Sequence, residues 1–125
     1  GVITLEIRNG CWHCDDLALE RGTLVDTFYG VVYPLKDRGL SGIEEMLIRE
    51  DIAAYCLAQV GKPYNINFLD AETENAFYCS QLAYKAYQRH GIDLNTGLAM
   101  QNVPGSDQIV YPQEIWNGFP HQRAE

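Results

Sequence analysis

Two cysteines and a histidine share the quartet Cys11-Trp12-His13-Cys14 near the start of the chain. Thiols at this C-x-x-C spacing form redox pairs in some proteins and one half of a zinc site in others. The histidine between them offers a third chemistry, because imidazole is the side chain most often used as a general base. Residues elsewhere in the chain must decide between a redox pair, a metal site and a catalytic base.

Cys79 is the cysteine that such a base would serve. It opens the segment CSQLAYKAYQRHG, which predicts a helix from about Tyr78 to His90 with Gly91 as its stop. The first turn of a helix has unpaired amides that stabilise an anion, so a thiolate is favoured there. The apolar spacing also places Cys79 on the predicted core face, where most cysteines are inert packing residues.

The chain holds three histidines, and one of them suits this thiol. His90 lies at the far end of the same predicted helix, where we expect it to cap the C-terminus. His121 lies in the terminal segment, which we expect to be frayed. His13 therefore remains as the predicted base. Cys56, in the middle of an earlier predicted helix, is assigned to the core.

Three motifs together resemble the NlpC-type papain-like cysteine hydrolases. They are G-K-P-Y at residues 61–64, Y-C-S-Q-L at residues 78–82 and R-H-G-I-D-L at residues 89–94. In the usual order of that family the histidine follows the cysteine, whereas His13 precedes Cys79. The chain therefore resembles the circularly permuted branch, the YiiX/YebB-like hydrolases. The resemblance extends over most of the chain, to a G-D-I-like start at residues 1–3 and a proline segment at residues 111–115.

This resemblance implies a hydrolase that cleaves an amide or related acyl bond through an acyl-enzyme. Cys79 would be the nucleophile, His13 the base, and the Cys79 amide a donor to the oxyanion. We group Tyr64, Ser80 and Gln81 as substrate or oxyanion residues; a core tyrosine is the alternative for Tyr64. The implied substrates are peptides such as peptidoglycan fragments, or other acyl compounds, and neither a cofactor nor a metal is implied.

The residue that would orient His13 depends on how the segment that carries His13 pairs with the strand expected at residues 23–28. If residues 19–22 form a four-residue loop, Asp15 lies opposite Asp26 and both share a face with His13. A shift by one residue would remove Asp26 from that face. Asp26 falls where the permuted branch carries an acidic residue and is the predicted orienting residue, with Asp15 in reserve. Ordinary solvated carboxylates remain the alternative for both.

The elements that must position these groups follow from the hydrophobic pattern. We expect strands at residues 2–7, 23–28 and 31–33, with a turn at Asn9-Gly10. A capping box of Ser41 and Glu44 starts a helix whose apolar face should meet the core and which ends at Gly61. A strand at residues 108–111 and a short turn or helix at 112–116 would follow the second helix.

This order predicts an α+β fold of the papain-like, permuted NlpC type. A small antiparallel sheet or partial barrel would pack against two main helices. Residues 1–120 are expected to form a single domain, followed by a frayed tail at residues 121–125.

Composition narrows the classes of partner. The 125-residue chain has a net charge of −8 and no basic cluster, which argues against nucleic acid as a partner. No apolar run approaches the roughly 20 residues of a membrane span. Four cysteines are too few for a disulfide scaffold. The compartment and the oligomeric state stay open, and removal of a signal peptide would make a secreted or periplasmic protein.

Two further classes compete with the hydrolase. A strand followed by C-W-H-C resembles the opening of a glutaredoxin-like oxidoreductase, in which Cys11 would attack disulfides and Cys14 would resolve them. A non-catalytic binding domain on the same fold is the other. A zinc site is less favoured, because Cys56 and Cys79 lie on helix faces without the spacing of a second half-site.

Overall fold

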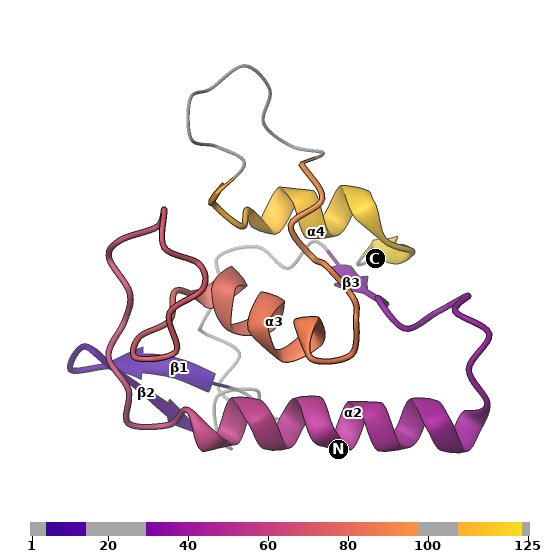
Figure 1. Ribbon diagram of the computed structural model, residues 1–125, viewed down its shortest axis with the longest axis horizontal. Helices are drawn as coiled ribbons and strands as arrows, with labels where there is room; N and C mark the ends of the chain where they lie inside the picture. The colour runs from indigo at the N-terminus through magenta and orange to yellow at the C-terminus, as the bar shows by residue number, and fades with distance from the viewer. Residues whose placement is uncertain (1–4, 15–29, 98–107, 124–125) are drawn as a thin grey trace.

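The computed structural model describes residues 5–14, 30–97 and 108–123, which form three helices and two small antiparallel sheets (Figure 1). In chain order the elements are β1 (Leu5–Arg8), β2 (Cys11–Cys14), β3 (Gly30–Val32), α2 (Gly42–Ala58), α3 (Cys79–Gln88), α4 (Pro112–Gly118) and β4 (His121–Arg123). This is the α+β arrangement that the sequence predicts. Within these residues, no helix combines the length and the apolar character needed to cross a membrane.

β1 and β2 form a hairpin at the predicted turn. Asn9 and Gly10 both have positive φ, 53° and 79°, which is the combination that a tight two-residue hairpin turn requires. The register places Ile7 opposite Trp12, so these two side chains share one face of the hairpin. His13 follows Trp12 and therefore belongs to the other face.

The free edge of β2 is extended by residues 61–64, which follow α2. The Trp12 amide donates to the Lys62 carbonyl at 2.9 Å. Tyr64 in turn forms a bridge with Phe77. The hairpin is thereby connected, through two neighbouring backbone segments, to the chain that enters α3.

The indole of Trp12 fills the space between the hairpin and α3. Trp12 is buried and packs with Phe77 and Leu82 in one core cluster, against which the half-buried Cys56 of α2 also packs. Its Nε1 donates to the Phe77 carbonyl at 2.9 Å. A buried polar atom is thus satisfied at the point where the hairpin meets the start of α3.

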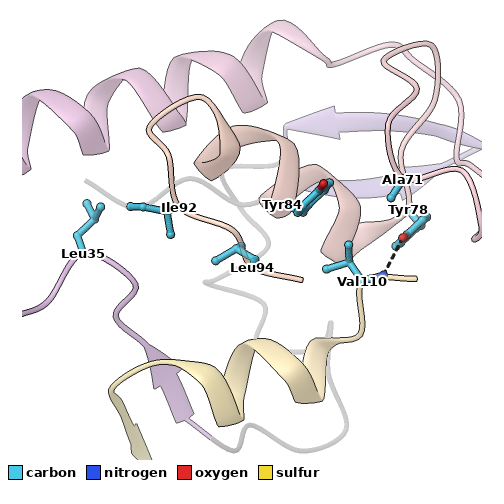
Figure 2. Close-up of a cluster of buried hydrophobic side chains, with 7 residues drawn as sticks. All are labelled: Leu35, Ala71, Tyr78, Tyr84, Ile92, Leu94 and Val110. Carbon is cyan, nitrogen blue, oxygen red and sulfur yellow. Dashed lines mark hydrogen bonds between the residues drawn. The ribbon is translucent and has the colours of Figure 1, made fainter. Parts of the chain in front are cut away.

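A second core cluster surrounds α3. Its buried members are Leu35, Ala71, Tyr78, Tyr84, Ile92, Leu94 and Val110 (Figure 2). Ile48 of α2 and Ile115 of α4 pack against this cluster, and α3 lies between these two helices (Figure 1). The Tyr78 hydroxyl accepts a hydrogen bond from the Val110 amide at 3.0 Å (Figure 2).

α2 begins as predicted and Cys56 packs against the core as predicted, but most of the predicted apolar face is exposed. Ser41 is the N-cap, and its hydroxyl accepts from the Glu44 amide at 3.1 Å. The exposed members of the predicted apolar face are Ile43, Met46, Leu47, Leu57 and Val60. The helix carries apolar residues on more than one side, so its periodicity leaves two candidate faces. Contact with α3 selects the side that includes Ile48 and Cys56.

The C-terminal segment also differs from its prediction. Residues 121–123 are not frayed but form β4, which pairs antiparallel with β3 and places Gly30 opposite Arg123. A Cβ at Gly30 would lie 2.1 Å from the Gln122 carbonyl oxygen, so this pairing requires a glycine. Residues 108–111 form no strand and lead instead into α4. The strand predicted at residues 23–28 lies outside the described residues.

Candidate active site

Cys79 is exposed to solvent at the first position of α3. The prediction that it faces the core is therefore wrong. The buried residues of α3 are Ser80, Gln81, Leu82, Tyr84 and Ala86. Two of these five, Ser80 and Gln81, are polar, and their burial reflects hydrogen bonds that an apolar periodicity cannot register. The loop before α3 and the two core clusters cover the helix on those sides, and the thiol of Cys79 remains accessible.

Tyr64 is the predicted site residue that lies next to Cys79. Burial raises the pKa of the Tyr64 hydroxyl and the neighbouring Cys79 thiol raises it further, whereas a hydrogen bond with the Cys79 backbone lowers it. A backbone group that lowers the pKa of a phenol donates a hydrogen to its oxygen. The thiol and the backbone of Cys79 therefore both lie close to the Tyr64 hydroxyl.

Ser80 ties the start of α3 to the segment before α4. Its hydroxyl donates to the Val110 carbonyl at 2.5 Å, while the Val110 amide donates to Tyr78. Both polar groups of Val110 are thus used by the residues on either side of Cys79. Ser80 is buried, so its side chain supports the position of the thiol.

Gln81 is completely buried and joins α3 to the loop of residues 65–76. Its Oε1 accepts from the Tyr78 amide at 2.9 Å and from Asn65 Nδ2 at 2.9 Å. Its Nε2 donates to the carbonyls of Ala71, Thr73 and Ala76 at 3.4, 3.0 and 3.2 Å. Because Asn65 directly follows Tyr64, this network fixes the distance between the tyrosine and the helix start.

Asn65 is a site-supporting residue that the sequence analysis did not single out. It is buried, and its amide nitrogen also donates to the Asp70 carbonyl at 2.9 Å. Its oxygen accepts from the Asn67 amide at 2.9 Å. The signal available in the sequence is an asparagine immediately after G-K-P-Y, since a turn residue there has both a donor and an acceptor with which to organise the loop.

None of the three histidines, all within the described residues, hydrogen-bonds to Cys79. His90 does not cap its helix as predicted but lies 2.7 Å from Asp51 of α2. His121 stacks on Trp116 with 4.0 Å between ring centroids. His13 lies in β2, and side-chain alternation puts it on the face opposite Trp12. Asp15 and Asp26, the predicted orienting residues, lie outside the described residues.

The extended geometry of β2 keeps the two thiols of the C-W-H-C quartet apart. Cys11 and Cys14 are both in β2, three residues apart, so they point to opposite faces at a backbone separation of about 10 Å. A disulfide needs Cα atoms closer than about 7 Å. Among the residues that the structure describes, no cluster of side chains suits a metal ion. This arrangement supports neither the redox pair nor the zinc half-site.

A cysteine at the start of a helix, packed beside a small sheet in an α+β fold, is the arrangement of papain-like cysteine hydrolases. A family model described as permuted papain-like amidase enzyme, YaeF/YiiX, C92 family, matches residues 25–117. The chain belongs to this family, and its class is therefore that of a cysteine peptidase or amidase. Comparison with curated proteins and with solved structures gives no match. Tyr64 and Cys79 lie within the matched residues, and His13 precedes them.

We predict that iodoacetamide at neutral pH labels Cys79 before Cys56. Burial raises the pKa of Cys56 from 9.0 to about 11, which leaves roughly a hundred-fold less reactive thiolate. Peptide mapping by mass spectrometry after partial labelling measures the order. Earlier labelling of Cys56 contradicts the burial pattern, and earlier labelling of Cys11 favours the redox alternative.

We also predict that Gln81→Met destabilises the protein by about 2–4 kcal/mol. The variant keeps the volume but leaves buried donors and acceptors without partners, at about 1–3 kcal/mol for each buried group. Gln88→Met, on the exposed end of the same helix, is the matched control and should change stability by about 0.5 kcal/mol or less. Urea unfolding measures both. Equal effects of the two substitutions would show that the Gln81 network does not hold the loop.

Proposed function

We propose that this protein is a cysteine amidase in which Cys79 attacks the carbonyl carbon of an amide or related acyl bond. The observation that carries the proposal is the exposed thiol at the start of α3, with the Tyr64 hydroxyl close to it. The backbone amide of Cys79 would donate to the substrate oxyanion, with the Tyr64 hydroxyl nearby.

The proposed reaction proceeds in two steps. The thiol proton of Cys79 passes to His13 as the Sγ–C bond forms, and the carbonyl electron pair moves to oxygen. The tetrahedral intermediate collapses, the C–N bond breaks, and the imidazolium of His13 gives its proton to the leaving nitrogen. Water then attacks the thioester with His13 as base, which releases the acid and restores the thiol. Tyr64 would turn its hydroxyl to donate to the oxyanion in both steps.

His13 is proposed as the base because the other two histidines are already engaged. His90 is paired with Asp51, and His121 contacts Trp116 and the Phe119 carbonyl. Since the His13 ring lies on the face opposite Trp12, the proposal requires it to approach the thiol in the substrate complex, where catalytic hydrogen bonds commonly tighten.

The orienting residue and the substrate complete the proposal. Asp26 would hold the His13 ring in the required tautomer, with Asp15 as the alternative. Peptide amides, including those of bacterial cell-wall peptides, are the first substrates to examine, because the family is one of amidases.

We predict that Cys79→Ala abolishes hydrolysis and leaves the fold intact, since the side chain is exposed. Cys56→Ala is the control, and it should cost about 1–3 kcal/mol of stability with little change in rate. Assays against a panel of peptidoglycan fragments and acyl-lipids, with circular dichroism of each variant, measure both effects. Hydrolysis that persists in purified Cys79→Ala would end the proposal.

The supporting roles have separate expected magnitudes in the same assay. His13→Ala should lower kcat by about 10²–10⁴-fold, which is the usual contribution of a general base. Tyr64→Phe should lower kcat by about 10²–10³-fold through loss of an oxyanion donor. His90→Ala serves as the histidine control and should leave kcat within a few-fold. Equal rates in the His13 and His90 variants would remove His13 from the mechanism.

A further inference from the structure

Three apolar side chains are exposed on the short loop that follows Tyr64. Ile66, Phe68 and Leu69 are 86%, 46% and 52% exposed. Single exposed apolar residues are common and need no explanation. Three within four residues form a local apolar surface, which in a folded protein commonly marks a site of contact with an apolar group. We call these three residues the apolar lip.

The loop that carries the apolar lip is held by hydrogen bonds at its base. Asn65 Nδ2 donates to the Asp70 carbonyl at 2.9 Å, which closes the loop across the three apolar residues. Inside it, the Asp70 amide donates to the Asn67 carbonyl at 3.1 Å. The buried Gln81 then ties Asn65 to α3 at 2.9 Å. The lip is thus displayed on a framework that is anchored to the nucleophile's own helix.

Phe68 connects the lip to the site. Its ring meets the ring of Tyr78 edge to face, with centroids 5.3 Å apart and planes at 88°. Tyr78 is the N-cap of α3 and directly precedes Cys79. The loop therefore packs against the residue that precedes the thiol, and Tyr64 at its other end lies close to Cys79.

The charges of the loop disfavour an acidic group at this position. Residues 65–70 read N-I-N-F-L-D and contain no cation. The Asp70 carboxylate accepts from the amides of Glu72 and Thr73 at 3.3 and 3.2 Å, so it serves the turn that follows. A carboxylate beside the lip would find no cation within the loop to offset its loss of water.

From this arrangement we infer that the substrate's acyl group is apolar and lies against Phe68 and Leu69. The inference rests on the proposed function, because it names the acyl group that Cys79 would receive. The acyl chain of the substrate loses contact with water when it packs on these side chains, which is favourable. The binding free energy gained in this way holds the substrate in place as the transition state forms. Amides of apolar acyl groups are therefore the substrate class, and acyl groups that end in a carboxylate are disfavoured.

Alkyl chloromethyl ketones of increasing chain length test this inference without a known substrate. The Cys79 thiolate displaces chloride, a carbon–sulfur bond forms, and the alkyl chain occupies the place of the acyl group. The second-order labelling rate of Cys79, divided by that of glutathione, should rise about two-fold per methylene, about half the free energy of full burial. A reagent whose chain ends in a carboxylate should react more slowly than its alkyl counterpart.

Variants assign the effect to the lip. Phe68→Ser and Leu69→Ser should flatten the dependence of the labelling rate on chain length. Leu47→Ser is the matched control, since Leu47 on α2 is 56% exposed, close to the 52% of Leu69. It should leave the dependence intact, and circular dichroism confirms that each variant is folded.

Two results overturn the inference. A wild-type rate that does not depend on chain length contradicts it and leaves the proposed function standing. A dependence that survives in both lip variants shows that the apolar chain binds elsewhere. If no reagent labels Cys79, the proposed function itself fails, and the inference falls with it.

Discussion

The start of α3 depends on a buried amide side chain whose hydrogen-bonding groups must all be satisfied inside the protein. Gln81 has no exposed surface, and an unpaired amide in that position would cost more than most single contacts provide. Its oxygen therefore holds the Tyr78 amide and Asn65, and its nitrogen gathers the carbonyls of the preceding loop. This one constraint fixes Tyr64, the loop and Cys79 relative to one another.

The contrast between two cysteines follows from that constraint. Cys56 packs beside Trp12 and Leu82, where burial disfavours its thiolate. Cys79 itself needs no such contacts, because its neighbours Tyr78 and Ser80 both hydrogen-bond to the backbone of Val110. The backbone is thus held on both sides of the thiol while the thiol stays accessible. A nucleophile needs this combination of a fixed position and an open approach.

Local signals predicted the ends of elements well. Ser41 and Glu44 marked the start of α2, and Asn9-Gly10 marked the hairpin turn, because capping and turn chemistry act within four residues. Gly91, with φ of 74°, follows the end of α3 as predicted. The G-K-P-Y and Y-C-S-Q-L motifs predicted the family, which the match over residues 25–117 confirms.

The directions of faces were harder to predict, because they depend on partners distant in the sequence. The outward face of α2, with Ile43 and Leu47, is apolar too, and contact with the two core clusters decides which side packs. Cys79 was assigned to the core from apolar spacing, but the polar Ser80 and Gln81 are buried instead, because they find hydrogen-bond partners inside the protein. β4 pairs with β3 about 90 residues earlier in the chain, a non-local contact that no short pattern announces.

The central claim is that Cys79 forms the covalent acyl-enzyme. Mass spectrometry after acid quenching of the protein with a p-nitrophenyl ester of an apolar acid tests it most directly, because a good leaving group lets the thioester accumulate. The account predicts one added acyl group, located by peptide mapping on the peptide that contains Cys79 and removed by hydroxylamine. An acyl group found on Cys11, Cys14 or Cys56 instead, or turnover of the ester by a protein that never carries one, would contradict it.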